Sequence, residues 1–239
     1  MMGNKEELFQ ILDTFKGVIS STWESDKVED FCSCLLFSND LKEWTVVLEK
    51  IPQSIILRSA HNECVTANLF CSLGLYKQAM ISLRLCLEHC LHAIQLSAND
   101  FQFRRWKAGQ VDMQWASIVS PDDGLFSKAF IKAYAPEFVE RSAELHSIAK
   151  NVYRECSEYV HGNYDKLNSL PAQSQFNQEL FDRYIQAFHS VSYLLSITLV
   201  IRFKDHLLSN GVLRSLEQPI MNTISMLPEI QHLFEVEEC

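Results

Sequence analysis

The chain has 239 residues, 47% of them hydrophobic, which is enough for one large domain with its own core and excludes a disordered chain. It holds only 7 Gly and 6 Pro, too few for the many tight reversals of a β-sandwich or barrel. With 30 acidic and 21 basic residues the formal net charge is −9. The chain is therefore not a general nucleic-acid coat protein, and any contact with RNA or DNA depends on a local patch.

Apolar residues recur with helical spacing along the whole chain, and no segment reads as a strand. The expected helices cover residues 5–20, 41–50, 53–71, 75–97, 136–160 and 173–208. Residues 100–135 predict short helices and turns between two of them. The fold class is therefore all-α, a bundle of four to five long antiparallel helices. We divide the single domain into an N-terminal helical extension, a bundle core and a helical, acidic tail, over residues 1–52, 53–210 and 211–239.

Three features predict a cytoplasmic protein that does not contact a membrane. The opening residues Met1–Glu7 are polar and charged, unlike a secretory signal, and the cysteines are scattered in apolar runs as expected of free thiols. The most apolar stretch, from Val191 to Phe203, is interrupted by Ser196 and Thr198. Because it is also shorter than the ~20 residues of a membrane span, it predicts a core helix.

One helix, over residues 136–161, separates an apolar face from a polar ridge on a helical wheel. Its expected core stripe comprises Leu145, Ile148, Ala149, Val152, Cys156, Tyr159 and Val160. Arg154 and His161 lie almost opposite that stripe, about 20° apart around the helix axis and about 10 Å apart along it. Lys150 and Ser157 share their ridge, and Glu158 lies at its edge.

This polar ridge has two interpretations. The first is a solvated helix face on which Arg154 and Glu158 form an ion pair. The second is an acid–base face for a phosphodiester. Arginine offers a planar, fixed charge to phosphate oxygens, and histidine exchanges a proton near neutral pH.

The segment Tyr153–Tyr164, YRECSEYVHGNY, resembles the R-x4–6-H motif of the HEPN superfamily, here with R-x6-H spacing. The helix Tyr76–His89 is similar to the core helix that precedes the motif in several HEPN-like families. The resemblance covers roughly residues 75–205. It implies an α-helical bundle, and many members are metal-independent ribonucleases of toxin–antitoxin, CRISPR and phage-defence systems.

The resemblance also implies a mechanism. In a homodimer, each copy contributes Arg154 and His161 to one cleft, where the RNA 2′-hydroxyl attacks the adjacent phosphorus. His161 moves protons and Arg154 stabilises charge on the phosphoryl oxygens, with no metal or other cofactor. An antitoxin or a defence-complex protein is a further partner that the resemblance implies. The expected supporting residues are Lys150, Ser157, Glu158, Asn163 and Tyr164.

Two departures from the family motif leave a second class of function open. Glu155 puts an acid directly after the arginine, where many active members carry a polar residue, and Asn163 stands where some carry a tyrosine. Together with the charge of −9, Glu155 favours a catalytically inactive HEPN-like interaction or scaffold subunit of a larger assembly. A helical bundle unrelated to the superfamily is the third interpretation.

The segment Phe101–Lys107, FQFRRWK, is the only run of basic charge. Its cations could hold phosphates while its aromatic rings stack on unpaired bases. Alternatively, these rings, with Trp115 and Phe126, pin an irregular insert onto the bundle. The predicted RNA-binding residues are Arg104, Arg105, Trp106 and Lys107.

Patterns of metal-ligating residue types occur, but none makes a complete site, and we expect no metal. On the wheel, Cys86 and Cys90 fall in an apolar stripe while His92 points away from it. Arg84 and Glu88, one turn apart, are expected to form a structural ion pair. The patterns are Cys32 with Cys34, the string Cys86, His89, Cys90 and His92, and the pairs Glu158–His161 and Glu229–His232.

Overall fold

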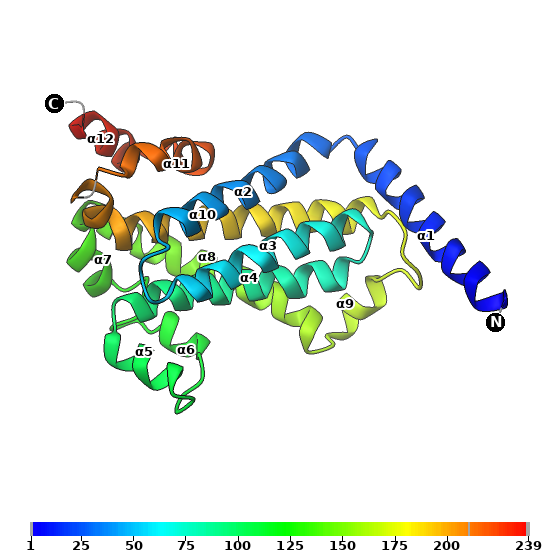
Figure 1. Ribbon diagram of the computed structural model, residues 1–239, viewed down its shortest axis with the longest axis horizontal. Coiled ribbons are helices and arrows are strands. Elements are labelled where there is room, and N and C mark those ends of the chain that lie inside the picture. Colours follow the sequence, from blue (N-terminus) through cyan, green and yellow to red (C-terminus); the bar gives the residue numbers. More distant parts are fainter. Residues whose placement is uncertain (1, 210, 238–239) are drawn as a thin grey trace.

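The computed structural model describes residues 2–209 and 211–237, and its helical architecture confirms the all-α class (Figure 1). Met1, Asn210, Glu238 and Cys239, which belong to the divisions predicted above, lie outside the described residues. No strand occurs in the described part of the chain. The long helices are α1 (Met2–Trp23), α2 (Val28–Val47), α3 (Ser54–Ser72), α4 (Tyr76–Ser97), α8 (Ser142–Val160) and α10 (Gln178–Ser209).

Shorter helices connect and cover these long ones. They are α5 (Asp100–Lys107), α6 (Trp115–Ile118), α7 (Lys128–Tyr134), the 3-10 helix η1 (Pro136–Arg141), α9 (Tyr164–Ser169), the 3-10 helix η2 (Leu213–Leu216), α11 (Glu217–Ile224) and α12 (Pro228–Glu237). The C-terminal helices pack onto the bundle and bury Leu213, Leu216, Ile220 and Ile230. Two polar contacts hold them there: Asn222 donates to Asp40 on α2, and Arg141 donates to Glu229 on α12.

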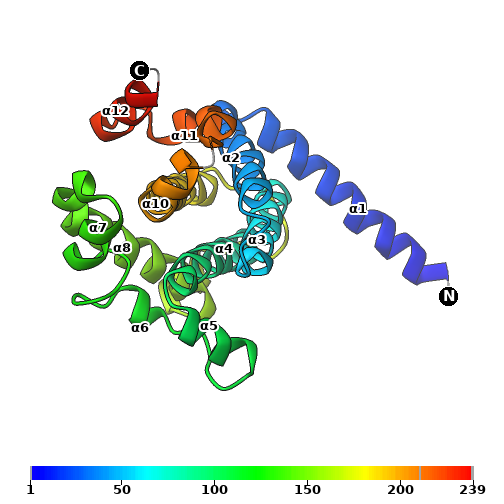
Figure 2. The same cartoon turned by 60° about the vertical axis from the view of Figure 1, so that its left-hand side comes forward.

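The core of the bundle is organised around α10, which lies against α2, α4, α8 and α11 (Figure 2). Aromatic side chains fill the space on its α2 side, where Phe31 packs on Phe181 with ring centroids 5.2 Å apart. Among the described residues, α10 is the one helix long and apolar enough to cross a bilayer, yet 78% of its most apolar stretch is buried inside the protein. The prediction of a core helix over Val191–Phe203 is therefore confirmed.

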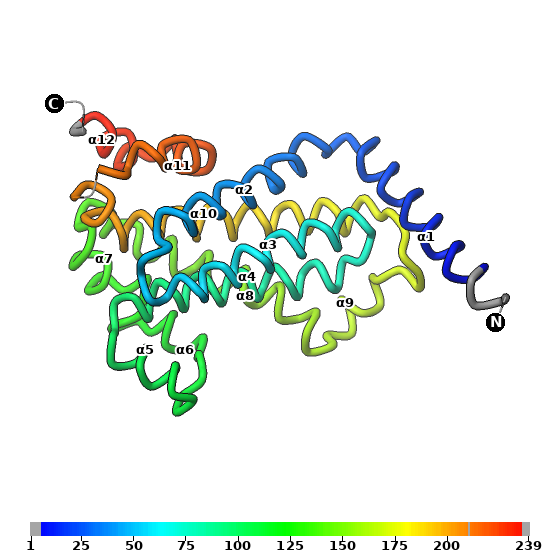
Figure 3. The backbone as a smooth tube through the Cα atoms, viewed as in Figure 1, coloured from blue at the N-terminus to red at the C-terminus, as the bar shows by residue number. Residues whose placement is uncertain are grey.

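The expected N-terminal segment, residues 1–52, contains two unlike helices. The predicted start of the shorter helix over 41–50 is wrong, because α2 begins at Val28. Its buried residues lie on several sides because α2 contacts α3, α10 and α11, so no single apolar stripe marks it in the sequence. The first helix, by contrast, extends away from the bundle and is buried only near its end, at Val18 and Thr22 (Figure 3).

Three expectations around α8 are corrected. Residues 136–141 form a 3-10 helix, so the α-helix begins only at Ser142. The next long helix begins at Gln178 instead of 173, because Asn177 caps its first turn through Oδ1 and the Leu180 amide. The short helix α9 was not expected. The sequence places Val160 in the core stripe, but its side chain is 41% exposed. The buried stripe of α8 is narrower than predicted, and Val160 lies at its edge.

Candidate functional site

The polar ridge of α8 faces away from the core, as its sequence spacing predicts. The opposite side of the helix is anchored by Leu145, Ala149, Val152, Cys156 and Tyr159, all buried. The Arg154 side chain is 82% exposed, and Lys150 and His161 are exposed as well. His161 is the C-cap of the helix, and Gly162 ends it with a φ of +71°. Arg154 and His161 therefore project from the same helix, with His161 at its end.

Acidic side chains and one lysine surround Arg154. Its Nε lies 3.4 Å from Oε1 of Glu158, so the ion pair of the first interpretation is present. The short helix α9 folds back against α8 and brings Lys166 Nζ to 3.6 Å from Glu155 and 3.7 Å from Glu158. Lys166 thus offsets the two acids next to Arg154. Lys166 is not among the site residues predicted from the sequence. The one sequence feature that points to the short helix carrying it is its capping residue, Asn163.

The expected supporting residues do not form one group. The Ser157 hydroxyl donates to the Tyr153 carbonyl at 2.6 Å, a contact within the helix. Asn163 Oδ1 accepts hydrogen bonds from the backbone amides of Asp165 and Lys166, so it caps α9. Tyr164 is 78% exposed and points away from the bundle surface. Ser157 and Asn163 thus hold local structure at the site.

Behind the ridge, Arg84 and Glu88 form the expected ion pair, with Nη2 and Oε1 3.1 Å apart. The same Nη2 donates to the Tyr153 hydroxyl at 2.8 Å, which ties α4 to α8 one residue before Arg154. Trp115 stacks on the Tyr153 ring with centroids 3.9 Å apart. Burial raises the pKa of Tyr153, so this phenol keeps its proton at neutral pH.

The basic segment on α5 divides into two parts. Arg104, which pairs with Asp100 at 2.7 Å, and Lys107 are exposed to solvent. Arg105 and Trp106 instead line a cavity between α4, α5 and α7. The anchoring role is confirmed for Phe103 and Phe126, which are buried, and for Trp115, which stacks on Tyr153. It is wrong for Phe101, which is 67% exposed.

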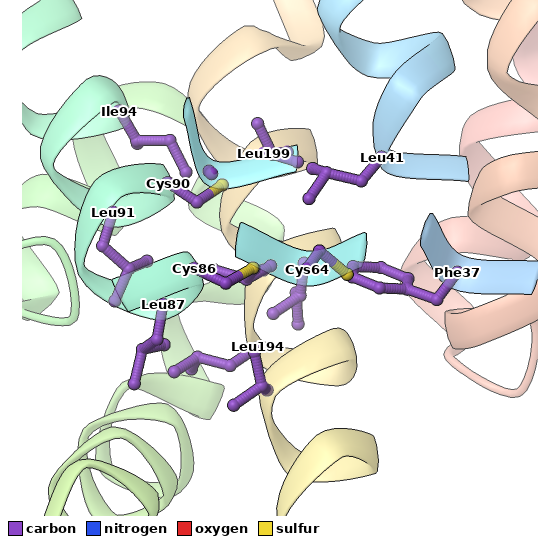
Figure 4. Close-up of a cluster of buried hydrophobic side chains, with 14 of the residues drawn as sticks. Phe37, Leu41, Cys64, Cys86, Leu87, Cys90, Leu91, Ile94, Leu194 and Leu199 are labelled. Atoms are coloured by element: carbon purple, nitrogen blue, oxygen red, sulfur yellow. The ribbon is translucent and has the colours of Figure 1, made fainter. Parts of the chain in front are cut away.

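Among the described residues, no group of three or more His, Cys, Asp or Glu is placed to hold a metal ion. Cys64, Cys86 and Cys90 lie among leucines in the core (Figure 4). Burial raises the pKa of Cys90 well above its ordinary range, so its thiol is protonated and unreactive at neutral pH. His92 is predicted to point away from the apolar stripe of α4, yet it is buried, 4% exposed, because the segments after α4 cover that side of the helix.

In a single chain, Arg154 and His161 lie on an exposed helix surface. Neither residue lines any of the three best-formed cavities among the described residues. No protein-family model, curated protein or solved structure matches the chain. The chemistry of the described side chains is therefore the basis on which a function can be assigned.

Proposed function

We propose that the chain is a HEPN-like, metal-independent endoribonuclease, a cytoplasmic toxin or phage-defence effector, whose site forms between two copies across the Arg154–His161 ridge. The observation that supports this most is the placement of both side chains. Arg154 is 82% exposed and His161 is exposed at the end of the same helix, so neither is committed to the core. A twofold axis at this helix end would bring a second Arg–His pair to the first.

The proposed reaction uses the RNA as its own nucleophile. One copy's His161 accepts the 2′-hydroxyl proton while the 2′-oxygen bonds to the adjacent phosphorus. The bond from phosphorus to the 5′-oxygen breaks, and the other copy's His161 gives that oxygen a proton. Arg154 stabilises the negative charge on the phosphoryl oxygens. The products are a 2′,3′-cyclic phosphate and a 5′-hydroxyl.

The carboxylates beside Arg154 are compatible with this role. The contact between Arg154 and Glu158 is long and exposed, and pairs of this kind contribute less than ~1 kcal/mol. An RNA phosphate can therefore replace Glu158 as the partner of the guanidinium. Lys166, which contacts both Glu155 and Glu158, reduces the repulsion that these acids exert on the phosphate.

A second candidate function is a catalytically inactive interaction or scaffold subunit. The observation that favours it is the apolar surface of α1, where Leu8, Phe9, Ile11 and Leu12 are each 45% to 65% exposed. Large exposed apolar patches mark sites of protein interaction. In this case an antitoxin or a defence-complex protein is the partner, and Glu158 remains paired with Arg154.

The two candidates are separated by RNA cleavage in the presence of a chelator. We expect the wild-type chain to cut RNA, and His161→Ala and Arg154→Ala each to reduce the rate by about 10²-fold or more. Arg58→Ala and His232→Ala are matched controls, because both residues are exposed on other helices and both variants should keep full activity.

Equal activity in all five proteins would overturn the ribonuclease proposal, because the cleavage would then come from another site or another protein. A wild-type chain that cuts no RNA and binds a protein partner through α1 would support the scaffold function. Sedimentation of the same samples tests the homodimer independently.

A further inference from the structure

A cavity of about 560 Å³ lies where the end of α4 meets α5, α6 and α7. Pockets for small ligands typically have volumes of ~300–1,000 Å³. Figure 1 shows α5 and α6 at one end of α4 and α9 towards the other. Neither Arg154 nor His161 lines the cavity, although Trp115, which lies between the lining residues Gln114 and Ser117, stacks on Tyr153 next to the ridge. The cavity belongs to no site described above, although three residues of the basic segment, Gln102, Arg105 and Trp106, line it.

Three aromatic side chains, Trp106, Phe130 and Tyr134, form part of the cavity wall. Their neighbours hold them in place. Trp106 stacks on Phe103 with ring centroids 6.0 Å apart, and Phe130 lies against Tyr134 at 4.8 Å. The Arg202 guanidinium lies 4.6 Å from the Tyr134 ring centroid. The wall thus contains aromatic side chains fixed by their neighbours, and such side chains suit a planar, aromatic ligand.

The polar part of the wall consists mainly of neutral hydrogen-bonding groups, from the side chains of His92, Gln95, Asn99, Gln102 and Gln114. Gln95 Oε1 already accepts a hydrogen bond from Ser117 at 3.1 Å, which fixes its orientation and leaves its amide N–H groups as donors. Burial lowers the pKa of His92 to about 4, so the imidazole is neutral at pH 7. One ring nitrogen is hydrogen-bonded to the Gln95 side chain, which leaves the other for a ligand. Donors and acceptors of this kind match the edge of a nucleobase.

The charged side chains that line the cavity limit how many phosphate groups the ligand can carry. Among the described residues that line the cavity, Arg105 is the one cation, and Asp112 and Asp123 are the two acids. Asp123 accepts a hydrogen bond of 2.5 Å from the Ser120 hydroxyl. One guanidinium suits one phosphate group, whereas a triphosphate would be repelled by the two carboxylates.

We propose that this cavity binds one unpaired nucleotide, with its base against the aromatic wall and its phosphate on Arg105. A free nucleoside monophosphate and a single nucleotide within an RNA strand offer the same chemistry. The inference does not depend on the proposed nuclease activity, because none of its residues belongs to the ridge on α8.

Calorimetric titration of the full chain tests the site with nucleoside monophosphates of the four bases, the corresponding nucleosides, inorganic phosphate and a single-stranded RNA pentanucleotide with 2′-O-methyl groups, which the proposed nuclease cannot cut. We expect saturable binding of at least one monophosphate with one site per chain. Arg105→Ala should weaken that binding by about tenfold and change nucleoside binding by less than about twofold. Arg104→Ala is the matched control: it lies on the same helix, is 76% exposed and does not line the cavity.

A second variant, Gln95→Ala, should weaken both the nucleoside and the monophosphate, with circular dichroism showing that it remains folded. If the pentanucleotide binds more tightly than the monophosphates, the source is RNA, and Lys107→Ala should then weaken only the pentanucleotide. Tighter binding of a monophosphate identifies a free nucleotide.

The inference is overturned if the folded wild-type chain binds none of these probes saturably. It is also overturned if inorganic phosphate binds as tightly as the monophosphates, or if Arg104→Ala and Arg105→Ala have equal effects. The nucleosides and monophosphates contain no phosphodiester bond that the proposed nuclease could cut, so a failure of the nuclease proposal is distinguishable from a failure here.

Discussion

Arg84 on α4 donates a hydrogen bond of 2.8 Å to the hydroxyl of Tyr153 on α8, and its guanidinium carbon lies 4.7 Å from the centroid of the same ring. Tyr153 directly precedes Arg154. Because one contact is directional and the other is made to the ring face, together they fix how α8 is rotated about its axis. The direction in which Arg154 projects is therefore set from the neighbouring helix.

Replacing Arg84 tests this link. Arg84→Ala removes the hydrogen bond to Tyr153 and leaves Glu88 without its cation, so we expect the free energy of unfolding to fall by about 2 kcal/mol. Arg154→Ala is the matched control, because that side chain is 82% exposed and should change stability by less than ~0.5 kcal/mol. Urea unfolding of both variants measures the difference. Equal losses would show that Tyr153 does not depend on Arg84.

Glu158 should limit the affinity of the ridge for RNA. Glu158→Gln removes a negative charge that lies 3.4 Å from Arg154 and 3.7 Å from Lys166, so we expect RNA to bind several-fold more tightly at low salt. Fluorescence anisotropy with a labelled RNA measures this, and the gain should shrink as salt rises. Glu179→Gln, an exposed acid at the start of α10, is the control. An unchanged affinity would mean that the RNA phosphate does not approach this helix face.

His92 should make the fold sensitive to mild acid. Burial lowers its pKa from 6.5 to about 4 in the folded chain. Between these values the unfolded chain binds a proton that the folded chain does not, so stability is full above pH ~6.5 and falls as the pH drops towards ~4. The loss amounts to at most about 3 kcal/mol. Comparing wild type with His92→Gln by urea unfolding at several pH values isolates this contribution from the carboxylates, and identical pH profiles would refute it.

Gly74 should tolerate no side chain at the turn between α3 and α4. Its φ is +69°, and a Cβ there would lie 2.6 Å from the backbone oxygen of Gln175, in the segment that leads to α10. We expect Gly74→Ala to lower the melting temperature by several degrees, a loss of more than ~1 kcal/mol. Gly17→Ala on α1, where nothing lies within 4 Å, should be neutral or slightly stabilising. Similar melting temperatures for the two variants would contradict the close approach.

The spacing of apolar residues along the sequence predicts the helical architecture and the outward direction of Arg154. Both can be predicted because a helix with a single buried stripe shows that stripe in its own sequence. The prediction fails where several elements meet. The helix α2 packs on several sides, so it has no single apolar stripe. His92 is covered by the segments that follow α4, and a helical wheel of α4 alone cannot show where those segments run. Lys166 reaches Glu158 only because Gly162 reverses the chain after α8. Contacts of this kind, between elements linked by irregular turns, are fixed by the tertiary fold.

The most direct test of the proposed chemistry is the identity of the ends that cleavage leaves. The wild-type chain, with chelator present, should cut RNA to give 2′,3′-cyclic phosphate and 5′-hydroxyl ends, and should leave the same sequence uncut when every nucleotide is 2′-deoxy. Mass spectrometry of the fragments reads both outcomes. Fragments with 3′-hydroxyl and 5′-phosphate ends, or cleavage of the 2′-deoxy strand, would contradict the mechanism assigned to Arg154 and His161.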